Sequence, residues 1–190
     1  MVVIGILALQ GDFAEHRQKI VALGAKTIDI RQAKDLQAPL DGMILPGGES
    51  TVQGKLLRDL GMLEPLKSKI DAGLPVLATC AGLILLSQQI EDQESTHLAT
   101  LPVTVKRNAY GRQLGSFNTP LSFGDLGEVP ATFIRAPYIN QVDEGVEVLA
   151  EKDGKIVAAR FHNQLGLAFH PEVDENDSIH SYFLSICQTK

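Results

Sequence analysis

The sequence has few cysteines, no long apolar run and no excess of positive charge. Two cysteines in 190 residues, Cys80 and Cys187, are too few for a disulfide framework. The longest apolar runs, such as residues 81–86, are far shorter than the roughly 20 residues that a membrane-spanning helix needs. With 17 basic and 23 acidic residues, the formal net charge is −6, which argues against nonspecific binding to nucleic acid. We therefore expect a soluble protein with neither a membrane nor a nucleic-acid partner. The lack of a charged-then-apolar leader predicts a cytoplasmic location.

The first half of the sequence alternates strand and helix patterns. The apolar run over residues 2–9 is unbroken, which is typical of a strand buried on both faces, and helical spacing then runs from Phe13 to Gly24. Further strands are expected at 27–30, 42–45 and 75–79, and further helices over 54–60, 63–72 and 82–90. This alternation predicts an α/β fold with a mainly parallel sheet.

The second half is richer in short strand candidates. They lie at 103–105, 132–134, 146–149, 156–159 and 165–169, with a hairpin turn at 152–155 and a closing helix over 178–187. This pattern predicts an antiparallel extension of the sheet. Without repeats or linkers, residues 1–190 are expected to form one three-layer, flavodoxin-like α/β domain, with a mainly parallel central sheet flanked by helices.

Cys80 stands between a predicted strand and a predicted helix. In open parallel sheets, ligands gather outside the carboxyl ends of the strands, and Cys80 lies at such an end. Small neighbours at Ala78, Ala81 and Gly82 suit a tight turn that exposes the central side chain. The positive end of the following helix favours the thiolate, which is the nucleophilic form. The alternative is a buried and inert cysteine.

His170 and Glu172 supply what a nucleophilic cysteine needs. Residues two apart in an extended segment face the same way, and Pro171 keeps this segment out of a helix. Glu172 can therefore orient His170, which in turn serves Cys80 as a base. The sequence predicts a catalytic triad of Cys80, His170 and Glu172, with a plain surface turn as the alternative for the His-Pro-Glu segment.

The remaining histidines are weaker candidates. We expect His97, His162 and His180 to be solvated surface residues, whereas His16 follows the first loop and could support the site indirectly. No second cysteine or histidine lies at ligand spacing near Cys80, so no metal site is expected.

The Gly47-Gly48 pair lies in the loop after the third predicted strand. Glycines allow backbone angles that are closed to other residues and let an amide approach a ligand. Gly48 N–H and Ala81 N–H form our hypothesis for an oxyanion hole. The alternative is a plain turn in which Ser50 or Thr51 caps a helix.

Several segments together resemble the class I (triad) glutamine amidotransferases. They are the Leu45–Thr51, Thr79–Leu83 and Phe169–Glu172 segments. More narrowly, Leu7–Gly11, Arg107–Gln113 and Phe133–Pro137 resemble the glutaminase subunits of pyridoxal 5'-phosphate synthase (PdxT type). The chain departs from this family at Ala78, where glycine is common, and at Ala14, where arginine is common.

The resemblance implies hydrolysis of L-glutamine to glutamate and ammonia through a thioester on Cys80. The family's glutamine-binding positions match Gly48, Glu49, Ser50, Arg107, Ile134 and Arg135. Glutamine carries an ammonium and a carboxylate, so an acidic and a basic contact are both expected. Which arginine meets the carboxylate stays open, and no cofactor or metal is implied.

The resemblance also implies a partner, since ammonia released into water becomes protonated and loses its nucleophilicity. That partner is a (β/α)8-barrel synthase subunit that forms a dodecameric core in a hetero-oligomer, and Gln10 is a candidate for coupling to it. Two enzyme alternatives are the glutaminase of imidazole glycerol phosphate synthase and a γ-glutamyl hydrolase. A third is a noncatalytic α/β protein that uses Cys80 as a redox sensor.

Overall fold

Strands and helices alternate over the first half of the chain in the computed structural model, which describes residues 1–107 and 115–189. The elements in order are β1 (Val3–Leu7), α1 (Phe13–Ala22), β2 (Lys26–Ile30), the 3-10 turn η1 (Ala33–Gln37), β3 (Gly42–Leu45), α2 (Ser50–Asp59), α3 (Leu63–Asp71), β4 (Val76–Thr79) and α4 (Ala81–Leu86). The predicted alternation is confirmed, although α2 begins at Ser50 rather than at Gly54.

The second half is mostly strand. Its elements are β5 (Ser87–Ile90), β6 (Leu101–Lys106), β7 (Ser116–Ser122), η2 (Gly124–Leu126), β8 (Glu128–Ile134), β9 (Tyr138–Val142), β10 (Glu147–Lys152), β11 (Lys155–Phe161), β12 (Gln164–Leu167), η3 (Pro171–Val173) and α5 (Ser178–Gln188). Ten strands form one sheet in the order β2-β1-β3-β4-β12-β11-β9-β6-β5, with β10 paired to β11.

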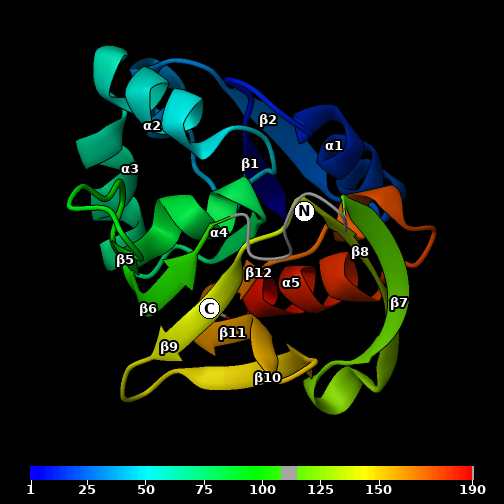
Figure 1. The fold of residues 1–190 in the computed structure, drawn as a ribbon. Coiled ribbons are helices and arrows are strands. Elements are labelled where there is room, and N and C mark those ends of the chain that lie inside the picture. The colour runs from blue at the N-terminus through cyan, green and yellow to red at the C-terminus, as the bar shows by residue number, and fades with distance from the viewer. Residues whose placement is uncertain (108–114, 190) are drawn as a thin grey trace.

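The sheet is parallel over one half and mixed over the other. β2, β1, β3, β4 and β12 run parallel to one another, with Ile4 opposite Gly42 and Leu77 opposite Leu165. β11 is antiparallel to β12, β10 and β9, and β9 is antiparallel to β6. Helices flank the sheet (Figure 1). The predicted parallel core with an antiparallel extension is confirmed.

A separate antiparallel pair, β7 and β8, stands at one side of the molecule (Figure 1). β7 was not predicted from the sequence, and Pro120 at its middle explains why, because proline is a poor strand residue. Pro120 lies opposite Pro130 of β8. The end of β8 brings Ile134 to the site described below.

The helix predicted over 82–90 is wrong in its second half. α4 ends at Leu86, and Ser87 turns out of the helix with ψ of 136°. Residues 87–90 instead form β5, which pairs in parallel with β6. The strand buries Ile90, so sheet hydrogen bonds and this contact prevail over the helical spacing.

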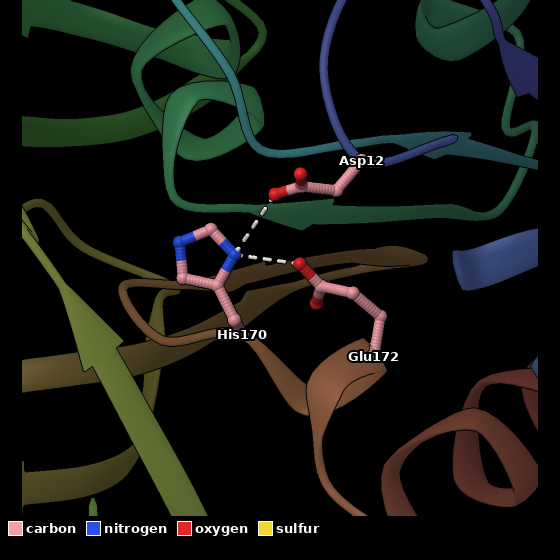
Figure 2. Close-up of side chains that lie close together, drawn as sticks. All are labelled: Asp12, His170 and Glu172. Atoms are coloured by element: carbon pink, nitrogen blue, oxygen red, sulfur yellow. Dashed lines mark hydrogen bonds and ion pairs between the residues drawn. The ribbon is translucent and has the colours of Figure 1, made fainter. Parts of the chain in front are cut away.

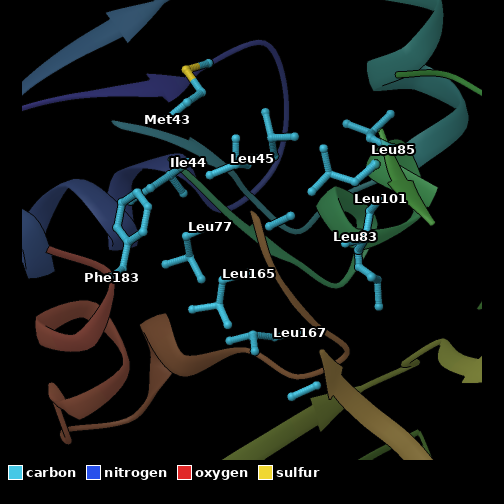
Figure 3. Close-up of a cluster of buried hydrophobic side chains, with 14 of the residues drawn as sticks. Met43, Ile44, Leu45, Leu77, Leu83, Leu85, Leu101, Leu165, Leu167 and Phe183 are labelled. Atoms are coloured by element: carbon cyan, nitrogen blue, oxygen red, sulfur yellow. The ribbon is translucent and has the colours of Figure 1, made fainter. Parts of the chain in front are cut away.

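Buried aliphatic side chains fill the space between the parallel strands and the helices (Figure 3). Leu77 and Leu165 lie on adjacent strands, and Leu83 comes from α4. A Cβ added at Gly42 would lie 2.6 Å from Sγ of Cys187, so α5 packs directly on β3. In the described part of the chain, no helix has the length and apolar character needed to cross a membrane.

Candidate active site

Cys80 lies at the junction of β4 and α4 in a strained backbone conformation. Its φ is 51° and its ψ is −103°, which a residue with a Cβ rarely adopts. The backbone N–H of Cys80 donates to the carbonyl of Leu167 at 2.8 Å. A Cβ added at Gly82 would lie 2.1 Å from the carbonyl oxygen of Leu45, so only glycine fits there. These contacts hold the turn that presents the thiol, as the small neighbours of Cys80 predicted.

His170 and Glu172 form a buried pair (Figure 2). Nδ1 of His170 and Oε1 of Glu172 are 2.6 Å apart, and the Glu172 side chain has no exposed surface. The two residues lie at the start of η3, and the His170 N–H donates to the carbonyl of Thr132 in β8. The pairing is the one predicted, with the carboxylate orienting the imidazole.

Asp12 is a second carboxylate at the same imidazole (Figure 2). Its Oδ2 lies 3.4 Å from Nδ1 of His170, and its side chain is 40% exposed. Sequence reasoning did not select Asp12, although its place directly after the Gln10 loop was a signal. Asp12, His170 and Glu172 are close enough together to hold a cation. A cation on Nδ1 would, however, displace the proton that His170 shares with Glu172.

The pKa of His170 is raised to about 12. Burial acts against the charged ring, but hydrogen bonds with Asp12, Cys80 and Glu172, together with the charge of Glu172, outweigh it. Burial also raises the pKa of Glu172, against the effect of the His170 contact. Two carboxylates face Nδ1 of His170, and one of them, Asp12, is partly exposed to solvent. We therefore assign a positive charge to the imidazole.

The contact between Cys80 and His170 is looser than the contact of His170 with Glu172. Nε2 of His170 is buried and has no hydrogen-bond partner within the described residues. Sγ of Cys80 lies 4.0 Å from the carbonyl oxygen of Ile134, at the outer limit for a thiol donor. The thiol still contributes to the raised pKa of His170. Cys80 and His170 are therefore close enough to interact electrostatically, but no aligned hydrogen bond joins them within the described residues.

The loop after β1 fastens the loop that holds Gly47 and Gly48. The Asp12 N–H donates to the carbonyl of Gly47 at 3.0 Å, and the Glu49 N–H donates to Oε1 of Gln10 at 2.8 Å. Gly48 has φ of 151°, which favours glycine. A displacement of Gln10 would therefore change the position of the loop that holds Gly48, the candidate oxyanion-hole residue.

A cavity of about 630 Å³ opens in front of Cys80. It is lined by Gln10, Asp12, Gly48, Glu49, Ser50, Cys80, Ala81, Ile84, Arg107, Ser116, Ile134, Arg135, Pro137 and His170. The structure thus gathers every predicted glutamine-binding position, both oxyanion-hole candidates and Gln10 around one space; their roles stay predictions. Sequence reasoning missed Asp12, Ile84, Ser116 and Pro137. The predicted motif residues 108–113 lie outside the described residues.

Two further histidines lie deep behind the triad. His16 and His180 have no exposed surface, so the expectation that His180 is a solvated surface residue is wrong. α5 turns this face toward α1, which the helical spacing of its apolar residues did not reveal. His162 is exposed as expected, whereas His97 is half-buried and contacts Arg58.

The fold and the strained cysteine beside a His-Glu pair define the class as a triad glutamine amidotransferase. The chain belongs to the SNO glutamine amidotransferase family, whose model matches residues 6–189. It is 59% identical to the pyridoxal 5'-phosphate synthase subunit PdxT of Desulfitobacterium hafniense over 95% of this chain and 91% of that one. It is 52% identical to PdxT of Haemophilus influenzae over 97% of this chain and 98% of that one.

Solved structures share the same fold. A crystal structure described as a glutamine amidotransferase matches with a TM-score of 0.92 and 40% identity, over 97% of this chain and 98% of that one. A putative GMP synthase subunit from Thermoplasma acidophilum matches with a TM-score of 0.70 and 18% identity, over 98% of this chain and 94% of that one. The second likeness concerns the fold alone.

Proposed function

We propose that this chain is the glutaminase subunit of pyridoxal 5'-phosphate synthase. It hydrolyses L-glutamine to L-glutamate and ammonia and passes the ammonia to the synthase subunit. The observation that carries the proposal is the strained Cys80 beside the buried His170–Glu172 pair, at the base of a charged cavity. The 51–59% identity to PdxT proteins over nearly the whole chain supports pyridoxal 5'-phosphate synthesis as the pathway that uses the ammonia.

The chemistry follows from the pair of Cys80 and His170. The thiolate attacks the side-chain amide carbon of glutamine, and the carbonyl becomes a tetrahedral oxyanion. The His170 imidazolium then gives its proton to the amide nitrogen, the C–N bond breaks, and ammonia leaves a thioester on Cys80. His170 next takes a proton from water as that water attacks the thioester, and glutamate leaves with the thiolate regenerated. One water is consumed for each ammonia released.

Two backbone amides are the proposed oxyanion donors. Gly48 and Ala81 both line the cavity together with Cys80. Each preorganised donor of this kind lowers the barrier by on the order of 3–4 kcal/mol. The contacts of Gln10 and Asp12 with the Gly48 loop make that loop the natural point of control.

Charged side chains account for the recognition of free glutamine. Glu49 is the proposed partner of the substrate ammonium, and Arg107 that of the carboxylate. Within the described residues, the hydrogen bond recorded for Arg107 is a long one, 3.4 Å to the hydroxyl of Thr51, so its guanidinium keeps donors for a ligand. Three further proposed glutamine-binding residues in the cavity lining are Ser50, Ile134 and Arg135. The backbone of Arg135 is strained, with φ of 45°.

The proposed partner is a barrel-fold synthase subunit that forms a dodecameric core. Docking is proposed to act through Gln10, because the loop of that residue contacts the Gly47-Gly48 segment. A nucleophilic thiol must stay reduced, and Cys80 is a free cysteine, in keeping with the proposed cytoplasmic location. No cofactor or metal takes part in the proposed reaction.

The central test measures ammonia release from L-glutamine by the wild type and by Cys80→Ala, each with and without the synthase subunit. We expect release by the wild type with synthase and none above background by the variant. Equal release by both proteins would overturn the mechanism. Release without dependence on any synthase would favour the γ-glutamyl hydrolase alternative.

The arginine assignment has its own test. Arg107→Ala should raise the KM for glutamine about 10- to 100-fold, the loss expected for a hydrogen-bonded ion pair with the substrate, with kcat changed far less. Arg135→Ala is the matched comparison in the same cavity. A larger KM effect from Arg135→Ala would reverse the assignment.

A further inference from the structure

The buried side of Glu172 has a partner that the triad does not explain. Oε1 of Glu172 is taken by His170, whereas Oε2 points the other way, 3.4 Å from Nε2 of His16. The side chains of His16 and Glu172 are both completely buried. Oε2 accepts no aligned hydrogen bond within the described residues, so the approach of His16 is an electrostatic contact. A buried carboxylate oxygen without a donor is costly, so the proton state of His16 decides how this oxygen is satisfied.

His16 connects three elements at this point. It comes from α1, and its Nε2 also lies 3.2 Å from the hydroxyl of Thr79, the residue before Cys80. Its Nδ1 lies 2.9 Å from Nε2 of His180 in α5, with ring centroids 5.1 Å apart. The two rings are therefore linked to both ends of the triad, through Glu172 and through the residue that precedes the nucleophile.

Both histidines are neutral near pH 7. Burial, then the neighbouring His180 and His170, hold the pKa of His16 well below its ordinary value. Burial and then Lys19 lower the pKa of His180 to about 4, against the opposing effect of Asp177. Each ring thus carries one N–H, and the short contact between them has one donor and one acceptor.

The two possible tautomer arrangements of His16 and His180 differ in how well they satisfy the surrounding groups. If His16 donated from Nδ1, its bare Nε2 would face the Glu172 carboxylate, and His180 would bury an N–H at Nδ1. That atom has no hydrogen-bond partner within the described residues. If His180 donates from Nε2, then Nε2–H of His16 faces Oε2 of Glu172 and the Thr79 hydroxyl. The second arrangement leaves one bare ring nitrogen, which costs less than a buried donor beside a repelled carboxylate.

We propose that His16 is a positioning residue of the active site and that His180 sets its tautomer. Nε2–H of His16 attracts Oε2 of Glu172 across 3.4 Å and fixes the rotation of the carboxylate, so that Oε1 stays on Nδ1 of His170. Because His16 is neutral, it orients Glu172 without cancelling the charge that stabilises the imidazolium. The inference deepens the proposed glutaminase function and rests on it for the catalytic readout alone.

The test compares two substitutions of the same length, His16→Gln and His16→Met. The glutamine amide can accept from His180 and donate to Glu172, whereas the methionine thioether cannot donate. With synthase present, we expect His16→Met to lower kcat about 10- to 100-fold, as for loss of a hydrogen bond to a charged group, with little change in KM. His16→Gln should retain kcat within a few-fold of the wild type.

A second readout needs neither glutamine nor synthase. The rate of Cys80 alkylation by iodoacetamide is followed by mass spectrometry as a function of pH in the complete chain. Loss of the Glu172 orientation should destabilise the imidazolium, so the pH profile of His16→Met should shift, while that of His16→Gln should follow the wild type. This profile stays informative even if the wild type releases no ammonia, which would count against the proposed function instead.

Identical kcat values and identical alkylation profiles for the two variants would overturn the inference. A change confined to KM would overturn it as well, because a positioning residue behind the triad does not touch the substrate. If His16→Met fails to fold, the pair His180→Gln and His180→Met carries the same comparison. Only His180→Gln can donate to Nδ1 of His16, and equal behaviour of this pair would be equally decisive.

Discussion

The two sides of the His170–Glu172 pair differ in charge and in exposure to solvent. The cavity side holds Asp12, Glu49 and the arginines, which are charged and reach solvent. The buried side holds His16, Thr79 and His180, which are uncharged at neutral pH and have no exposed surface. The exposed side can exchange substrate and respond to a partner, while the buried side can only hold geometry.

Around the His170–Glu172 pair, the largest effect is expected on the cavity side, from a change at His170 itself. His170→Asn should lower the rate of ammonia release about 10²- to 10⁴-fold, because it removes the group that protonates the leaving nitrogen. The measurement is kcat with synthase present, and circular dichroism reports on folding. Exposed His162→Asn is the matched control and should keep the wild-type rate. A loss of less than tenfold at His170 would contradict the assigned role.

The turn at Cys80, which lies between the cavity side and the buried side, depends on close packing at Gly82. Gly82→Ala places a Cβ within 2.1 Å of the Leu45 carbonyl, so α4 must shift away from β3. We expect a loss of about 1–3 kcal/mol in the free energy of unfolding, measured with urea, together with slower alkylation of Cys80. Gly115→Ala is the control, since a Cβ there meets no atom of the described residues within 4 Å. Equal stability of the two variants would show that α4 has more freedom than the contact suggests.

Sequence patterns revealed the cavity side far better than the buried side. Cys80 was found because small residues must surround a tight strand-to-helix turn, and His170 with Glu172 because their spacing sets them side by side. His180 was missed because nothing in the spacing of one helix says which other helix covers it. Likewise, the helical spacing over residues 82–90 does not reveal β5, since the pairing of β5 with β6 depends on residues more than ten positions away.

The buried histidines should make the fold sensitive to acid. Their pKa values are lower in the folded than in the unfolded chain, so their contribution is complete above pH 6.5 and is lost as the pH falls toward the folded value. For His180, with a folded pKa of about 4, a change from pH 7 to pH 5 should cost about 2 kcal/mol of unfolding free energy.

Urea unfolding at both pH values measures this loss, and His180→Gln should reduce it. Lys19, Asp177 and His16 are the charged or titratable neighbours that surround His180. His162→Gln, which changes an exposed histidine, should leave the loss as it is in the wild type. An unchanged pH dependence in His180→Gln would mean that the ring is not held neutral by the fold.

The smallest effect is expected from Asp12, the exposed carboxylate at Nδ1 of His170. The pKa of His170 is raised to about 12 because Asp12, Cys80 and Glu172 together overcome the opposing effect of burial. Asp12→Asn removes one negative partner, so the imidazolium should lose its proton at lower pH. The alkaline limb of the kcat/KM profile should then move to lower pH, with a change of less than about tenfold in rate at neutral pH.

Glu49→Gln removes a charge from the same cavity without touching His170, and it serves as the control for Asp12→Asn. It should change the KM for glutamine and leave the alkaline limb in place. If Asp12→Asn also left the limb in place, the buried Glu172 would be sufficient to hold the charge of His170. The cavity side would then contribute binding alone, and the geometry and charge of the base would be set entirely from the buried side.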